Sequence, residues 1–185
     1  MKLVIGLGNP GKNYIHTRHN LGFRVIDELI KTNDFNPRIR RLKYDIYRGI
    51  ISNEETVLLK PRTYMNNSGG AVRNFLGYTN EPLENILVVC DDFNLPFGKL
   101  RVRPGGSTGG HKGLESIIQQ LGTEVIPRLR IGIGLPPSAE AVEYVLENFS
   151  RQEEKELPVI INEAVEAIKT WISDGIEVSM NKFNN

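Results

Sequence analysis

Two kinds of proton-transferring side chain stand in suitable places along the chain: His19, in a polar loop, and the adjacent carboxylates Asp91 and Asp92. A histidine exchanges a proton near neutral pH, so His19 is the best candidate for a general base. Asp91 ends the most apolar run of the sequence, where a carboxylate could orient His19 and stabilise its charge. Asp91 could instead cap a turn through Asn94, a role that Asp92 could also fill. The spacing therefore predicts a general-base centre and leaves the partner of His19 open.

A metal site is a second interpretation of the same residues. His16 and His19 are three residues apart and could bind a metal ion together with the two aspartates. The chain has no compact ligand motif such as H-E-x-x-H, so we predict no metal and no cofactor. Activity that persists in a chelator would eliminate the metal interpretation.

Two glycine-rich segments imitate nucleotide-binding motifs. Residues Gly6 to Gly11 satisfy the dinucleotide pattern G-x-G-x-x-G, but Pro10 removes a backbone amide and the following residues have no apolar helical face. The second segment, Pro104 to Gly113, resembles a P-loop, but His111 stands in the lysine position and Gly113 stands where the motif needs Ser or Thr. We interpret the second segment as a turn before a helix, whose free amides could receive a phosphate.

Basic residues alternate along two expected strands. Lys99, Arg101 and Arg103 should project from one face, and Arg128 and Arg130 repeat the pattern. Such ridges are often simply solvated, but two of them beside a glycine-rich loop could clamp the phosphates of an RNA end. A further basic cluster, made by Arg38, Arg40, Arg41 and Lys43, lies in a connection that contains proline, and we assign it no specific role.

Segments with strand and helix periodicity alternate along the whole chain. Strands are expected at residues 2–7, 44–51, 56–60, 85–90, 99–103 and 128–134, and helices at 21–31, 65–76, 110–121 and 150–171. The last helix opens with Ser150 and Glu153 at capping-box spacing. The alternation predicts an α/β fold, a single-domain three-layer α/β/α sandwich with a twisted mixed central sheet, spanning residues 1–185.

Composition sets limits on the class of protein. The net charge of +1 excludes a surface coated in positive charge, so any contact with nucleic acid must come from local clusters. Cys90 is the only cysteine and lies in an apolar run, which indicates a reducing cytosol. The apolar run at the start is too short for a signal peptide or a membrane span, so we expect neither export nor a membrane anchor.

Several separate motifs together carry a resemblance to a known family. They are Gly6-Leu-Gly-Asn-Pro-Gly11, Tyr14, Thr17-Arg-His-Asn20, Tyr64-Met-Asn-Asn-Ser-Gly69, Asp91-Asp-Phe-Asn-Leu-Pro96, Gly109-Gly-His111 and Arg128-Leu-Arg-Ile-Gly-Ile-Gly134. In order and spacing the chain resembles bacterial-type peptidyl-tRNA hydrolases from residue 1 to about 181. The resemblance implies hydrolysis of the ester that joins a peptide to the 3′ end of tRNA.

The resemblance also implies roles for particular residues. His19 would activate water, Asp91 would orient His19, and Asn9 and Asn66 would position substrate and water. Residues implied to bind the substrate or the tRNA are Tyr14, Asn20, Tyr64, Met65, Arg101, Arg103, His111, Lys112 and Arg130. Lys112 departs from the asparagine that is common in the family; its charge could hold a phosphate or lower the basicity of His19.

Together these implications describe a cytosolic, monomeric hydrolase with no cofactor and no obligate protein partner. Its substrate would be peptidyl-tRNA, held at the acceptor stem and the 3′ end. The alternative from another class is an RNA-binding relative that keeps the fold and has lost catalysis. A displaced Asp91 or an obstructed cleft would favour that alternative.

Overall fold

A computed structural model describes residues 1–136 and 141–184. Its centre is one seven-stranded sheet in the order β2-β3-β4-β1-β5-β7-β6. The four middle strands β4, β1, β5 and β7 run parallel, while β2, β3 and β6 are antiparallel to their neighbours. The mixed central sheet predicted from the sequence is therefore confirmed.

The expected strands and helices occur in the predicted order, and β2, α4 and α6 are additional elements. The strands are β1 (Lys2–Gly6), β2 (Ile39–Arg40), β3 (Tyr44–Ile51), β4 (Glu54–Pro61), β5 (Ile86–Asp92), β6 (Leu100–Arg103) and β7 (Arg128–Gly132). The helices are α1 (Leu21–Thr32), α2 (Ser68–Thr79), α3 (Lys112–Leu121), α4 (Ala141–Leu146), α5 (Arg151–Asp174) and α6 (Ile176–Phe183). Short 3-10 turns lie at Lys12–Tyr14, Arg18–Asn20, Met65–Asn67 and Leu83–Asn85.

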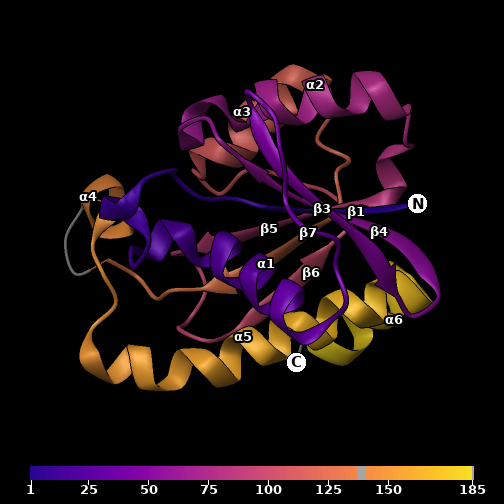
Figure 1. Cartoon of the computed structure of the whole chain (residues 1–185). Coiled ribbons are helices and arrows are strands. Elements are labelled where there is room, and N and C mark those ends of the chain that lie inside the picture. The colour runs from indigo at the N-terminus through magenta and orange to yellow at the C-terminus, as the bar shows by residue number, and fades with distance from the viewer. Residues whose placement is uncertain (137–140, 185) are drawn as a thin grey trace.

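Helices cover both faces of the sheet and make three layers (Figure 1). Helices α2 and α3 lie on one face, and α1, α5 and α6 lie on the other. Every residue of β5 is buried, which explains its continuous apolar run. Two apolar clusters, one on each side of the sheet, form the core and give the α/β/α sandwich that the sequence predicts.

Several boundaries differ from the expected ones for local reasons. Helix α3 begins at Lys112 and not at Gly110, because Gly109 and Gly110 have φ angles of 60° and 84°, which a right-handed helix does not use. Strand β5 continues through Asp91 and Asp92, which pair with β7. The two carboxylates are thus the last residues of the strand and are held by its ladder.

Close packing of α1 against the sheet fixes the loop that carries His19. A Cβ atom on Gly22 would lie 2.4 Å from the carbonyl oxygen of Val89 and 2.5 Å from the amide of Leu7, so only glycine fits there. The amide of Phe23 also donates to the carbonyl of Leu7. The start of α1, and the 3-10 turn before it, is therefore set at the carboxyl edge of β1 and β5. None of the described helices is both long and apolar enough to cross a bilayer.

Candidate active site

His19 and Asp91 meet at the carboxyl ends of the central strands. Nδ1 of His19 lies 3.0 Å from both carboxylate oxygens of Asp91, and both side chains are buried. The other ring nitrogen, Nε2, has no hydrogen-bond partner among the described residues, and His19 lines a cleft. Nδ1–H donates to the carboxylate, so Nε2 is the unprotonated nitrogen that can accept a proton.

The charges of this pair reinforce each other. Burial by itself lowers the pKa of His19, but the charge and hydrogen bond of Asp91 outweigh it, and the pKa rises above its usual 6.5. Burial raises the pKa of Asp91, but His19 and His111 outweigh that effect and hold it well below the usual range. Asp91 is therefore ionised at every physiological pH, and it makes His19 a stronger base.

His111 is the second histidine bound to Asp91. Its Nε2 lies 3.0 Å from Oδ1 of Asp91, and its Nδ1 accepts the backbone amides of Gly113 and Leu114 at 3.1 and 3.3 Å. His111 is thus the N-cap residue of α3. Because Nδ1 accepts two amides, the single ring proton stays on Nε2 and is donated to Asp91.

Asn9 lines the cleft beside the base, and Asn20 holds it in place. The amide of Asn9 donates to Oδ1 of Asn20 at 2.8 Å, and Nδ2 of Asn20 donates to the carbonyl of Asn9 at 2.9 Å. Oδ1 of Asn9 accepts the amide of Met65 at 2.8 Å. These bonds fix the side chain of Asn9 with its Nδ2 donor unused by the described residues. Asn9 can therefore offer a donor to an oxygen in the cleft.

The cleft beside His19 has a volume of about 400 Å³ and brings together residues distant in sequence. Its described lining consists of Asn9, His19, Tyr64, Met65, Asn66, Asp91, Phe93, Gly110, His111, Lys112, Ala141, Val142, Val145 and Leu146. Sequence reasoning did not anticipate the apolar wall from α4. Val142, Val145 and Leu146 have the i, i+3, i+4 spacing of one helix face, which is the signal that could have found it.

Two of the expected substrate residues, Tyr14 and Asn20, do not line the cleft, and a third, Lys112, lines it while paired with a neighbour. Tyr14 does not line the cleft and instead packs edge-on against Tyr64, with ring centroids 6.3 Å apart. Asn20 acts through its bonds to Asn9. Lys112 lines the cleft, but its Nζ is bound to Glu115 at 3.0 Å, and it is not a source of the pKa shift of His19.

The basic residues divide into exposed and structural ones. Arg101 and Arg103 lie partly exposed on β6, and neither forms an ion pair with a described residue. Arg130 pairs with Asp92 at 2.6 Å. The expectation that Arg128 forms part of a phosphate-binding ridge is wrong. Its side chain is buried and donates to the carbonyls of Gly106, Ser107, Glu124 and Ile126, which it holds together.

Asp92 fills the turn-capping role left open by the sequence. Its Oδ1 accepts the amide of Asn94 at 2.9 Å, which frees Asp91 for the histidines.

Arg18 is a positioning residue that the sequence did not reveal. It precedes His19, is buried, and donates to the carbonyl of Asn148 at 2.7 Å and to Glu153 at 3.0 Å. Its guanidinium also stacks 4.3 Å from the ring centroid of Tyr144. Arg18 thereby ties the loop of His19 to α4 and to the first turn of α5.

The metal interpretation that paired His16 with His19 does not fit the structure, because His16 is exposed and stands outside the group of potential ligands. His19, Asp91 and His111 do present ligand atoms within 4.8 Å of one another. Nδ1 of His19 and Nε2 of His111 each lie 3.0 Å from Oδ1 of Asp91, at hydrogen-bond distance. The cap bonds of His111 further fix its proton on the atom that a metal would need. The arrangement is suited to proton transfer.

Fold and site together define an α/β protein with a histidine–carboxylate centre suited to general-base chemistry, open to a partly apolar cleft. A family model described as peptidyl-tRNA hydrolase matches residues 3–185, so the chain belongs to the peptidyl-tRNA hydrolase family. The peptidyl-tRNA hydrolase of Aquifex aeolicus is 48% identical over 185 residues, which cover 100% of this chain and 96% of the relative. That of Chloroflexus aggregans is 45% identical over 186 residues, covering 100% and 99%. The crystal structure of the enzyme from Acinetobacter baumannii matches with a TM-score of 0.93 and 33% identity, covering 100% of this chain and 94% of that one.

Proposed function

We propose that this protein hydrolyses the ester bond between a peptide and the 3′ end of tRNA, with His19 as the general base. One observation carries the proposal: Asp91 holds Nδ1 of His19 at 3.0 Å, while Nε2 remains without a described partner beside a cleft. That geometry supplies an oriented base where an ester could bind. The membership of the family supplies the substrate.

The unprotonated Nε2 of His19 starts the proposed reaction. Nε2 of His19 takes a proton from water while the water oxygen attacks the ester carbonyl. The negative charge that develops on the carbonyl oxygen is stabilised by amide donors of Asn9 and Asn66, which line the cleft. When the ester C–O bond breaks, the leaving tRNA oxygen takes the proton from the imidazolium. The products are a peptide with a free carboxyl group and a tRNA with its terminal hydroxyl restored.

The tRNA is held by phosphate contacts on the β6 side of the cleft. Arg101 and Arg103 offer guanidinium groups without described acidic partners, and Arg130 adds a third beside them. Tyr64 and Met65, with Tyr14 packed behind, form the opposite rim. Contacts to phosphate carry no base information, so the enzyme would accept many tRNAs.

We also infer a cytosolic monomer that works as one domain spanning residues 1–185, without cofactor or protein partner. Cys90 is the only cysteine, and it is buried in β5 with a raised thiol pKa, which suits a reducing compartment. Light scattering on the purified protein measures its mass in solution. A dimer at enzymatic concentrations would contradict the monomer.

The deciding experiment measures release of free tRNA from an N-blocked aminoacyl-tRNA. We expect release by the native protein and by the His16→Ala variant, an exposed histidine three residues from the base, but none by His19→Ala. Binding of tRNA should survive in all three proteins. Binding without release by the native protein would identify a non-catalytic RNA-binding protein instead.

A further inference from the structure

The basic cluster that had no assigned role opens onto a groove next to the cleft. Arg38 and Arg40 of this cluster, with Arg62, line a groove of about 640 Å³. Asn9 lines both this groove and the cleft of His19, so the two spaces meet at that residue. The groove lies at the same end of the sheet as the base, because Asp45 and Lys60 are paired where β4 ends.

Positive charge in this groove is only partly neutralised. The guanidiniums of Arg38, Arg40 and Arg62 lie 3.7, 3.6 and 3.9 Å from the single carboxylate of Asp45. These are ion-pair distances, and Oδ1 of Asp45 is buried without a hydrogen-bond partner. One negative charge thus faces three positive ones. Arg38 and Arg40 keep about half of their side-chain surface exposed and can turn toward a ligand.

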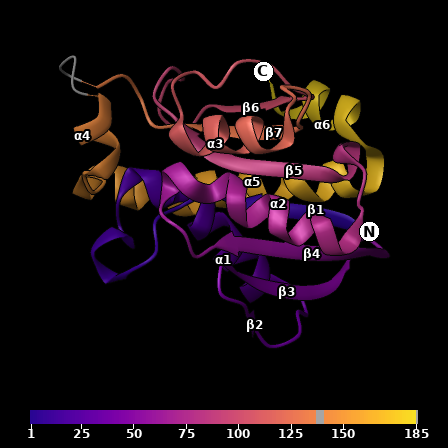
Figure 2. The same ribbon diagram turned by 90° about the horizontal axis from the view of Figure 1, so that it is seen from above.

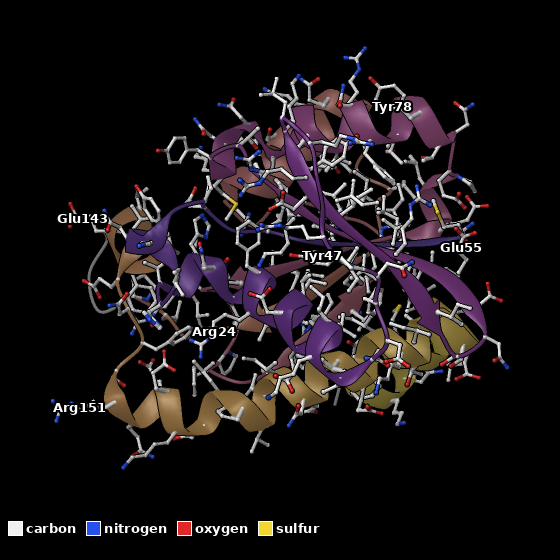
Figure 3. The ribbon with its side chains drawn as sticks, viewed as in Figure 1. Arg24, Tyr47, Glu55, Tyr78, Glu143 and Arg151 are labelled. Atoms are coloured by element: carbon white, nitrogen blue, oxygen red, sulfur yellow. The ribbon has the colours of Figure 1, made fainter. Side chains whose placement is uncertain are left out.

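The other charges of the groove do not remove this excess. Lys60 pairs with Asp27 at 2.7 Å, and Arg24 leaves α1 toward α5 and pairs with Glu154 at 2.8 Å (Figure 3). Lys12 also lines the groove and makes no ion pair with a described residue. The groove therefore carries a net positive charge beside the candidate catalytic centre.

The order of the strands separates this groove from the tRNA contacts. Arg101 and Arg103 lie on β6, at one edge of the sheet. Strands β1 and β5, whose carboxyl ends meet the base, lie in the middle of the sheet (Figure 2). The groove lies over β2, β3 and β4, at the other edge. If phosphates are held at the β6 edge and the ester in the centre, the acyl side of the ester extends toward the groove.

We propose that the groove is a peptide subsite that favours acidic side chains in the peptide part of the substrate. The inference rests on the proposed function. A carboxylate near the ester would form charge-assisted hydrogen bonds with guanidiniums that Asp45 does not saturate. A lysine in the same place would be repelled. The groove thus sets a preference among peptides while the tRNA contacts stay the same.

The test compares peptidyl-tRNAs that share one tRNA and differ only in a blocked peptide rich in Glu, Ala or Lys. The native protein should show a higher kcat/KM for the Glu substrate than for the Lys substrate. Exchanging both arginines (Arg38→Gln, Arg40→Gln) should lower the Glu-to-Lys ratio about threefold to tenfold, the effect of two exposed ion pairs. Arg48→Gln, which changes a partly exposed arginine of β3 outside the groove, should keep the native ratio.

A second variant acts in the opposite direction. Asp45→Asn removes the carboxylate that the three arginines share, so the Glu-to-Lys ratio should rise above the native one. An unchanged ratio in both groove variants would overturn the subsite. Equal loss for all three peptides, with a smaller dependence on salt, would overturn it in favour of an RNA contact. No release by the native protein would instead reject the proposed hydrolysis itself, and the subsite with it.

Discussion

His111 bonds to Asp91 through Nε2 and caps α3 through Nδ1, and replacing it with asparagine tests these two contacts separately. Asparagine is a good N-cap, so it can still accept an amide of the first turn of α3. It is too short to replace the 3.0 Å bond from Nε2 to Asp91. The substitution therefore keeps the cap and removes one of the two histidine donors from the buried carboxylate.

The loss can be estimated from the contacts. A hydrogen bond to a charged group contributes about 1.5–3 kcal/mol, so His111→Asn should lower the free energy of unfolding by about that amount. His111→Ala loses the cap as well and should cost about 0.5–2 kcal/mol more. Asp91 would then act on His19 alone, and the pKa of His19 should rise further above its usual value.

Urea unfolding and the pH profile of kcat/KM measure the two effects. Because Nε2 of His19 must be unprotonated, the native profile should rise with pH, with its midpoint above 6.5. In His111→Asn the midpoint should move to higher pH. The variant should therefore lose kcat/KM at pH 7 and regain part of it at higher pH. A midpoint that stays in place, or moves to lower pH, would refute the idea that the histidines share the charge of Asp91.

Three further outcomes follow from the site. Arg103→Ala should weaken tRNA binding, measured by titration at several salt concentrations, and reduce the salt slope by about 1, while kcat stays near native; an unchanged slope would remove Arg103 from the phosphate contacts. The pKa of Asp91 is lower folded than unfolded, so its contribution to stability is present above about pH 3.8 and is lost as pH falls toward the folded value. Chemical unfolding of Asp91→Asn should accordingly depend less on pH in that range, and an equal dependence would contradict the shift. EDTA should leave tRNA release intact; loss of release, restored by zinc, would establish a metal centre at His19, Asp91 and His111.

Sequence patterns predicted the parts of the molecule that depend on local order. Alternation and apolar runs located the central strands, and the place of Asp91 at the end of β5 brought it to the edge where His19 lies. The family resemblance named His111 as a neighbour of the site. Its hydrogen bonds to both Asp91 and the first amides of α3 could not be predicted, because they require α3 to start two residues later than expected.

The error at Arg128 has its cause in tertiary packing. Alternation correctly placed Arg101 and Arg103 on a partly exposed face, but the same rule failed for Arg128. The loop carbonyls around Arg128 need buried donors, and nothing in the spacing of β7 shows that need. The wall from α4 was missed for a local reason, because six residues are too few for a strong periodic signal.

The contacts of Arg18 bear on how the cleft moves. Because this one side chain joins the turn before α1 to Asn148 and Glu153 and stacks on Tyr144 of α4, an outward movement of that wall would break these partly buried contacts or carry the base with it. Substrate entry and product exit should therefore use side-chain rotations, on the nanosecond scale, and not slow hinge opening. We then expect the rate of turnover to be limited by chemistry or by release of tRNA, because the cleft is already formed before the substrate binds.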